Sequence, residues 1–428
     1  MVKLLDQLLQ KLDMPVAAYS TYDRYYHGRQ PLAYLAPEAR RALGDRFGRM
    51  ASNIPRLAVS ALSERLRVTG FRTNDDDDAV WADWKLNDLD QLSGVAHREA
   101  LALGQSFAIV WADKFGRPQV TIESARQVTV LRDPATRAVL AAVKRWETDT
   151  TTEAVLYTPE AITSFRAPTT GATTAGFKTV EVLTNPLGVV PVVPFINGDR
   201  LLGEGVSEIE DLIPLVDALN KTLADLMVSS EYVGRPRRWA TGVELVEDED
   251  GNVINPIPEG PRAMVSESPE TKFGQLPAAD LGAYEASVRI ILGQIMAVSA
   301  LPSHYIGITT SNPASADALR ASEASLTARA ETRQAQFGRS WEWVARLMAA
   351  VRTGRSVDQV TAHVQWADAA TRSVAQEADA VVKLVQAGIL PPSYALERLG
   401  YTADEIARIR EARRREAFDS AVTSGLTT

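Results

Sequence analysis

The sequence predicts an α+β fold that is mainly helical, and three observations lead to it. Apolar residues recur at helical spacing over long segments in both halves of the chain. In residues 105–146 they occur instead in short strand-like runs that turn residues separate. The chain has 428 residues, 45% hydrophobic and 23% charged, which is the ordinary globular range and is enough for two or three domains. We therefore expect a β region with helical segments before and after it.

The first domain is expected to cover residues 1–206, with helices followed by an antiparallel β meander. Five leucines among residues 4–12 form one helical stripe, and Pro55 is expected to end one helix and start another. Two threonine-rich stretches, 148–152 and 168–176, are typical of exposed loops. The prolines of residues 189–194 make that stretch extended and exclude it from the centre of a sheet. The predicted strands are residues 106–111, 119–123, 128–131 and 139–146.

The acidic run Asp75-Asp76-Asp77-Asp78 has two interpretations. Its carboxylates would suit a metal loop. The favoured interpretation is an exposed cap for a helix over residues 79–103, because negative charge is stabilised at the N-terminal end of a helix dipole.

Two helical segments flank an insertion rich in glycine, proline and charge. The first, residues 207–233, starts at a Ser207 and Glu210 pair that fits a capping box, and Pro214 is expected to kink or split it. The second covers residues 279–300. The insertion between them, residues 234–278, is predicted to be a small β-rich element with a hairpin turn at Asp250-Gly251.

A break at residues 301–314 precedes the longest predicted helix. Residues 315–353 can form one helix of roughly 55 Å, since Gly338 is its only weak helix former. Residues 354–428 are predicted to form a separate helical region with one short strand at residues 360–366. Its last helix is expected to end in Arg413-Arg414-Arg415, where cations favour the helix dipole, and residues 420–428 are expected to fray.

Motifs for catalysis are missing, so we expect neither an enzyme nor a cofactor or metal site. The sequence has no phosphate-binding loop, no serine elbow and no cysteine. Gly203-Glu204-Gly205 has no third glycine in register, and His97 is expected to be a surface or core histidine. The apolar stretch 290–301 is too short to cross a bilayer, and the N-terminus has no apolar centre of a signal peptide, so we expect no membrane association.

Charge gives one candidate binding cluster. Three arginines and a tryptophan follow the first flanking helix, and they fit either contact with DNA phosphates or an acidic partner, or ion pairs with a nearby acidic turn or a neighbouring subunit. The net charge of −8 is unlike that of a dedicated nucleic-acid binder, but it suits a channel through which DNA slides without tight phosphate contacts. The cluster and the acidic turn are Arg235, Arg237, Arg238, Trp239, Glu247, Asp248, Glu249 and Asp250.

Several local stretches, taken in their order, resemble the portal proteins of tailed bacteriophages, in the SPP1-like branch and among its actinobacteriophage members. The resemblance covers nearly the whole chain and depends on the order of the stretches, since no single one is as specific as a nucleotide-binding motif. The stretches lie at residues 25–28 (YYHG), 53–56 (NIPR), 210–220 (EDLIPLVDALN), 302–307 (PSHYIG), 315–323 (SADALRASE), 366–368 (WAD) and 373–376 (SVAQ).

The resemblance implies a head-to-tail connector: a ring, usually of twelve subunits, at one capsid vertex, through which double-stranded DNA is packaged and ejected. It implies a wing over residues 1–206 with the long helix 315–353, a two-helix stem at 207–233 and 279–300, a clip at 234–278 and a small crown at 354–428. Implied partners are the terminase large subunit, a head-completion protein, and the major capsid and scaffolding proteins, in the virion and, during assembly, the host cytoplasm. The implied DNA-facing tunnel loop, within residues 301–314, is Ile308, Thr309, Thr310, Ser311, Asn312 and Pro313.

Two other classes stay open at this point. One is a helical scaffold or adaptor of the virion that binds no DNA. The other is a metal-dependent enzyme acting on DNA, which would need Asp75-Asp76-Asp77-Asp78 to hold the metal.

Overall fold

The protein is described by a computed structural model that places most of the chain. It divides into two compact units, and each is described separately. Unit 1 consists of Met1–Ala61, Val95–Val110 and Val120–Thr309, and unit 2 of Leu62–Gly94, Trp111–Gln119 and Thr310–Thr428. The residues described are 2–31, 37, 51–74, 76–198, 200–201, 204–234, 238–243, 269–275, 281–307, 316–370, 374–401 and 403–425.

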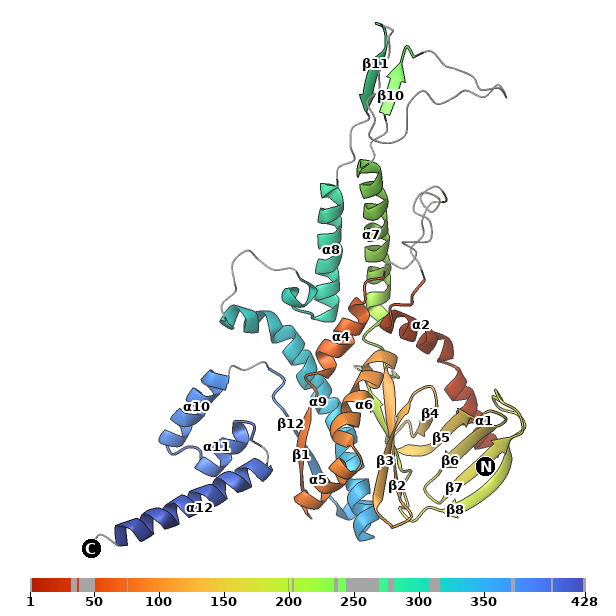
Figure 1. The fold of residues 1–428 in the computed structure, drawn as a ribbon. Coiled ribbons are helices and arrows are strands. Elements are labelled where there is room, and N and C mark those ends of the chain that lie inside the picture. Colours follow the sequence, from red (N-terminus) through yellow and green to blue (C-terminus); the bar gives the residue numbers. More distant parts are fainter. Residues whose placement is uncertain are drawn as a thin grey trace. The chain divides into compact units, whose positions relative to one another are not determined.

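Unit 1 contains a five-stranded antiparallel sheet in the order β4-β5-β6-β7-β8 (Figure 1). Of the strands predicted for one meander, 128–131 and 139–146 belong to this sheet, whereas 106–111 and 119–123 lie in a separate sheet, so the single meander is wrong in part. Helix α1 (Val2–Asp13) packs its leucine stripe on the sheet, and Leu5, Leu8 and Leu9 are buried among side chains of β5, β6 and β7. The predicted leucine stripe is therefore confirmed as a core face. Helix α2 (Val16–Tyr26) follows α1. The strands are β4 (Val128–Arg132), β5 (Val139–Glu147), β6 (Thr152–Tyr157), β7 (Ala161–Ala167) and β8 (Lys178–Thr184).

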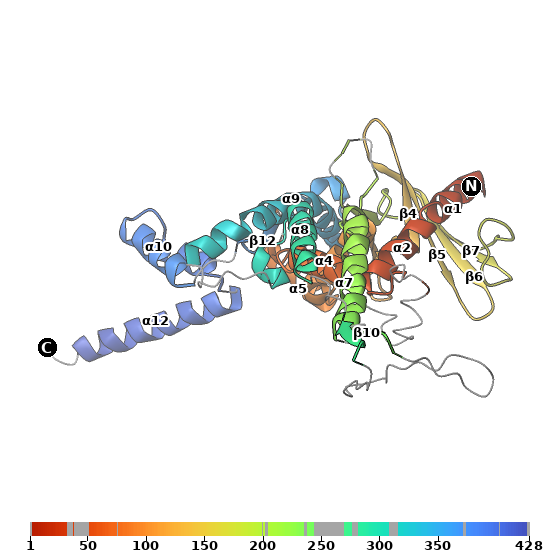
Figure 2. The same ribbon diagram turned by 90° about the horizontal axis from the view of Figure 1, so that it is seen from above.

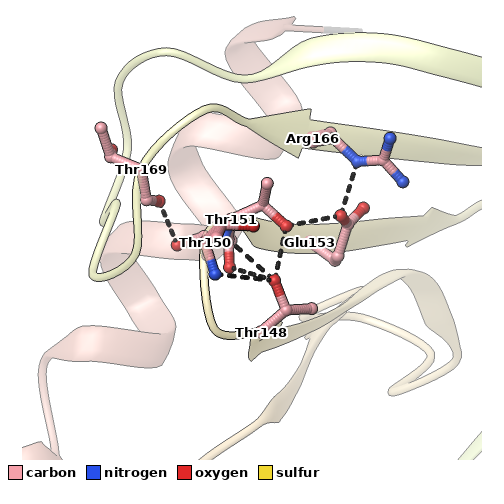
Figure 3. Close-up of polar contacts among 7 residues, drawn as sticks. Thr148, Thr150, Thr151, Glu153, Arg166 and Thr169 are labelled. Carbon is pink, nitrogen blue, oxygen red and sulfur yellow. Dashed lines mark hydrogen bonds and ion pairs between the residues drawn. The ribbon is translucent and has the colours of Figure 1, made fainter.

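The threonine-rich stretch 148–152 is a bonded turn, so its prediction as a plain exposed loop is wrong in part. The Thr148 hydroxyl accepts from the backbone amide of Thr151 at 3.0 Å. Thr152 is fully buried and donates to the carbonyl of Thr169 at 2.8 Å. Glu153 accepts from Thr151 at 2.9 Å and from Arg166 at 2.6 Å (Figure 3). Side-chain hydroxyls thus hold together the turns at one end of the sheet.

A second sheet has the order β3-β2-β9, formed by β3 (Pro118–Ser124), β2 (Gln105–Ala112) and β9 (Val192–Ile196). Strand β9 pairs antiparallel with β2 and is an edge strand, which agrees with the placement that its prolines allow. Helix α6 (Leu89–Leu103) precedes β2, and His97 on it is fully buried beside the ring of Phe195. Of the two placements predicted for His97, surface or core, the structure shows the core.

Unit 2 is built on a strand pair of which the sequence predicts one member, since the strand expected at residues 360–366 is confirmed as β12 (Ala362–Trp366). The other member, β1 (Val68–Thr73), is not predicted; it pairs antiparallel with β12. Helix α9 (Ala316–Thr353) contacts β12, and Gly338 gives it room, because a Cβ at Gly338 would lie 3.2 Å from Trp366 and Val364. The predicted long helix is confirmed. Gly338, the one weak helix former of α9, lies where β12 packs against the helix.

An aromatic cluster forms the core of unit 2. Trp84 lies on α5 (Asp77–Leu86) and is fully buried, with its ring 4.8 Å from that of Trp341 on α9 and 5.2 Å from that of Phe71 on β1. The helix predicted over residues 79–103 is in fact α5 and α6, which are separated at Asp88, where φ is 52°. As predicted, the acidic run caps the helix, since Asp76 accepts from the amide of Ala79 at 3.1 Å.

Three helices follow β12 in unit 2: α10 (Val374–Gln386), α11 (Pro392–Arg398) and α12 (Ala403–Gly425). Helix α11 contacts both α10 and α12. The helices themselves are predicted correctly, but the end of the last one is not. Helix α12 continues to Gly425, so Arg413-Arg414-Arg415 lies in its middle and the predicted fraying from residue 420 is wrong as far as Gly425.

Candidate functional site

The two flanking helices form an antiparallel pair in unit 1. Helix α7 (Ile213–Gly234) and helix α8 (Gly282–Ser299) lie side by side (Figures 1 and 2). The hydroxyl of Ser229 donates to that of Tyr284 at 3.0 Å and joins the two helices. In the first turns of α7 the apolar residues Val216 and Leu219 are buried, but from Lys221 to Ser230 every side chain is half-exposed. The two helices lie within a few residues of the segments predicted at 207–233 and 279–300, and their role as a stem stays a prediction.

The start of the first helix differs from the prediction. Ser207 does not cap a helix with Glu210; its hydroxyl accepts from the amide of Ile209 at 3.0 Å and donates to the carbonyl of Ala102. A short 3₁₀ turn, η2 (Glu210–Leu212), comes next, and α7 begins at Ile213. Pro214 is therefore in the first turn of the helix, where a missing backbone amide costs nothing, and it neither kinks nor splits the helix.

Polar side chains fix the base of α7 to the rest of unit 1. Tyr25 on α2 donates to Asp217 Oδ1 at 2.7 Å, and burial together with this carboxylate raises the pKa of Tyr25 to about 12. Burial and a hydrogen bond to Glu210 likewise raise the pKa of Tyr22 to about 12. The buried Asn220 accepts from both the amide and the hydroxyl of Ser52. The base of the helix pair is thus held by α2 and by the segment before α4 (Ile54–Ser63).

We expect Tyr25→Phe to lower the free energy of unfolding by about 1 kcal/mol at neutral pH, because it removes a hydrogen bond to an exposed carboxylate that water can replace. The pKa of Tyr25 is raised from 10.0 to about 12 in the folded state, so its contribution is complete below pH 10 and is lost as the pH rises through 12. Alkaline titration followed by ultraviolet absorbance should lose one late-titrating phenol in the variant. Unchanged stability together with an unchanged titration would contradict the anchor.

A short hairpin lies between the two helices in the sequence. Strand β10 (Arg238–Thr241) pairs antiparallel with β11 (Lys272–Gln275), and Trp239 is opposite Gly274. The indole occupies the space above this glycine, where a Cβ would come within 2.5 Å of the ring, yet 41% of Trp239 remains exposed. Sequence reasoning missed this strand pair, because the strands are short and 30 residues of chain separate them.

The structure places only part of the predicted site. Arg238 and Trp239 lie on β10. The other candidate residues lie outside the described part of the chain, as do the hairpin predicted at Asp250-Gly251 and Asp75 of the acidic run. They are Arg235, Arg237, Glu247, Asp248, Glu249 and Asp250, and the tunnel-loop residues Ile308, Thr309, Thr310, Ser311, Asn312 and Pro313.

Among the residues that the structure describes, no three histidine or acidic side chains are grouped so that they could hold a metal ion. Asp76 and Asp77 instead bond to backbone amides, at Ala79 and Thr73 respectively. Within the described ranges no helix combines the length and apolar character that a membrane crossing needs.

Comparison with known proteins gives one family over nearly the whole chain. The family model described as phage portal protein, SPP1 Gp6-like, matches residues 5–418. The portal protein of Mycobacterium phage L5 is 31% identical over 400 residues, covering 87% of this chain and 80% of that protein. The portal protein of Mycobacterium phage D29 is 31% identical over 402 residues, with the same coverage.

Solved structures with similar folds come from gene transfer agent (GTA) particles. A chain from the virion of a native GTA particle has a TM-score of 0.49 and 14% identity, covering 89% of this chain and 98% of that chain. A chain from the neck of a native GTA particle, computed with C12 symmetry, has a TM-score of 0.48 and 14% identity with the same coverage.

Proposed function

We propose a function from the premise that this chain belongs to the SPP1 Gp6-like family of phage portal proteins. Portal proteins are structural components of the virion, and we infer that copies of this chain form a closed ring. Double-stranded DNA would pass through its centre, and terminase and a head-completion protein would dock on the clip. The observation that supports the ring in this molecule is an uncharged, exposed face on one helix of the stem.

This exposed face runs along α8. Its members recur every three or four residues and fall within an arc of about 100°. Of its six residues one is a large apolar side chain: Ile290, which is 67% exposed. The charged pair Glu285 and Arg289 lies outside the arc and is bonded within the helix at 2.8 Å. The face consists of Ala283, Ala286, Ser287, Ile290, Gln294 and Ala297.

Such a face suits close approach by another helix. Interaxial distances of 8–10 Å depend on the side chains at the contact, and alanines on both sides of one isoleucine leave room for a partner to pack around it. In a closed ring each subunit uses two different surfaces, because the contact is heterologous. The α8 face must therefore meet a surface other than itself, and we assign it to α7 of the neighbouring subunit, which has half-exposed apolar side chains over Lys221 to Ser230.

Mass photometry and negative-stain microscopy of the full chain test the ring. Wild-type protein should give multi-subunit particles with a central opening wide enough for duplex DNA. Ile290→Glu should weaken each subunit contact about a hundredfold and move the distribution towards monomers, because it places an unpaired charge in every interface.

Ile389 provides a matched control, since it is also an isoleucine exposed by 67% but follows α10 in unit 2. Ile389→Glu should leave the ring intact. Wild-type protein that is monomeric without an opening would overturn the proposed ring and favour a helical adaptor. Intact rings of Ile290→Glu would overturn the assignment of the α8 face.

A further inference from the structure

Helix α12 separates its charges between two faces. At about 100° per residue, Arg410, Arg413 and Arg414 share an arc of about 100° that contains no acidic residue. The nearest acids, Glu411 and Glu416, lie about 60° outside it. The remaining arginines, Arg408 and Arg415, fall on the other side of the helix, among its acidic residues.

Helix stability does not explain the arginine face. Like charges three or four residues apart destabilise a helix by about 0.2–0.5 kcal/mol per pair, and Arg410 has this spacing to both Arg413 and Arg414. The sequence-based explanation, that cations stabilise a helix C-terminus, also fails, because α12 continues to Gly425 and the dipole effect is limited to the last turn. Glu411 is bonded to Arg415, on the mixed face, and not to the arginine face.

The arginine face is accessible over its whole length. All residues from Glu411 to Glu416 are exposed, and so is Arg410. Among the α12 residues whose side chains the structure describes, Ile406, on the same arc one turn before Arg410, is the buried one, at 8% exposure. The first turns of α12 are thus held in unit 2, and the arginine-bearing turns present guanidinium groups to solvent.

We propose that Arg410, Arg413 and Arg414 bind the phosphate backbone of double-stranded DNA, independently of its sequence. The three residues span about 6 Å of helix axis, and a duplex carries one negative charge per about 1.7 Å of its own axis, so each guanidinium can meet a different phosphate. An arc with three arginines and no acid suits a polyanion better than a protein surface of mixed charge. The proposed contact uses none of the residues of α7 and α8 from which the ring is proposed.

Binding of a fluorescent random-sequence duplex to the full-length protein, measured at several salt concentrations, tests the proposal. The triple variant Arg410→Gln/Arg413→Gln/Arg414→Gln should bind roughly tenfold more weakly, and its dependence of log K on log salt should be shallower by about 2.7, for three lost phosphate contacts. The control Arg408→Gln/Arg415→Gln removes arginines from the mixed face of the same helix. It should change affinity by less than about twofold, because nearby acids already compensate those charges.

Circular dichroism checks that both variants keep their helices, and mass photometry of the same samples examines the ring separately, since α7 and α8 are unchanged. A triple variant with wild-type affinity and salt dependence overturns the proposal. Equal losses in the triple variant and the control also overturn it, because they would reflect overall charge and not this face. Loss of DNA binding by the triple variant alone supports it whether or not rings form.

Discussion

Gly205→Ala is expected to destabilise unit 1 by about 3 kcal/mol, at the upper end of the usual cost of overpacking. A Cβ at Gly205 would lie 1.8 Å from the carbonyl oxygen of Gly104, and that oxygen cannot move away freely because it accepts from the amide of Asn197 at 2.9 Å. Gly104 itself has φ of +91° at the end of α6, and its own Cβ would lie 2.6 Å from the oxygen of Gly205. The two backbones therefore pack directly on each other.

Denaturant unfolding of the full chain measures the effect, and Gly94→Ala is the control. Gly94 lies in α6, the helix that ends just before Gly104, and nothing lies within 4 Å of the position where its Cβ would be. Alanine there should be neutral or stabilising by about 0.5–1 kcal/mol, because glycine is the weaker helix former. Equal stability of Gly205→Ala and wild type would show that the two segments can separate at little cost.

Features set by neighbouring residues are predictable from this sequence. The leucine stripe of α1, the length of α9 and the edge position of β9 follow from helical spacing, from the absence of helix breakers and from prolines. The cap at Asp76 follows from side-chain chemistry one turn away. In each case the residues that determine the feature lie within a few positions of it.

Features that depend on distant partners are not predictable in this way. Strand β1 looks helical from its neighbours and becomes a strand because β12, almost 300 residues later, supplies its hydrogen bonds. Gly205 appears featureless in the sequence, since its role is to meet Gly104 across about 100 residues of chain. For the same reason helix α7 starts at Ile213 and not at Ser207, whose hydroxyl bonds instead to Ala102.

Arg65→Leu is expected to cost unit 2 about 3–5 kcal/mol, the range for a buried ion pair that loses one partner. Arg65 follows α4 and contacts Glu323 on α9 at 3.1 Å, with side-chain exposures of only 8% and 13%. Its other nitrogen donates to the carbonyl of Ala369, after β12, at 2.7 Å. One guanidinium thus joins three segments that are far apart in the sequence, and the substitution removes the Arg65 donor from the carboxylate of Glu323 and from the carbonyl of Ala369.

The double variant Arg65→Leu/Glu323→Leu separates the cost of a buried carboxylate that has lost Arg65 from the net contribution of the ion pair. Replacing both partners removes the buried charge, so most of the lost stability should return in denaturant unfolding followed by tryptophan fluorescence. Arg339 lies on α9, as Glu323 does, but its side chain is 84% exposed. Arg339→Leu should therefore change the free energy of unfolding little, as is usual for surface ion pairs. A double variant no more stable than Arg65→Leu would mean that the bond to Ala369, and not the ion pair, determines how α9 is held.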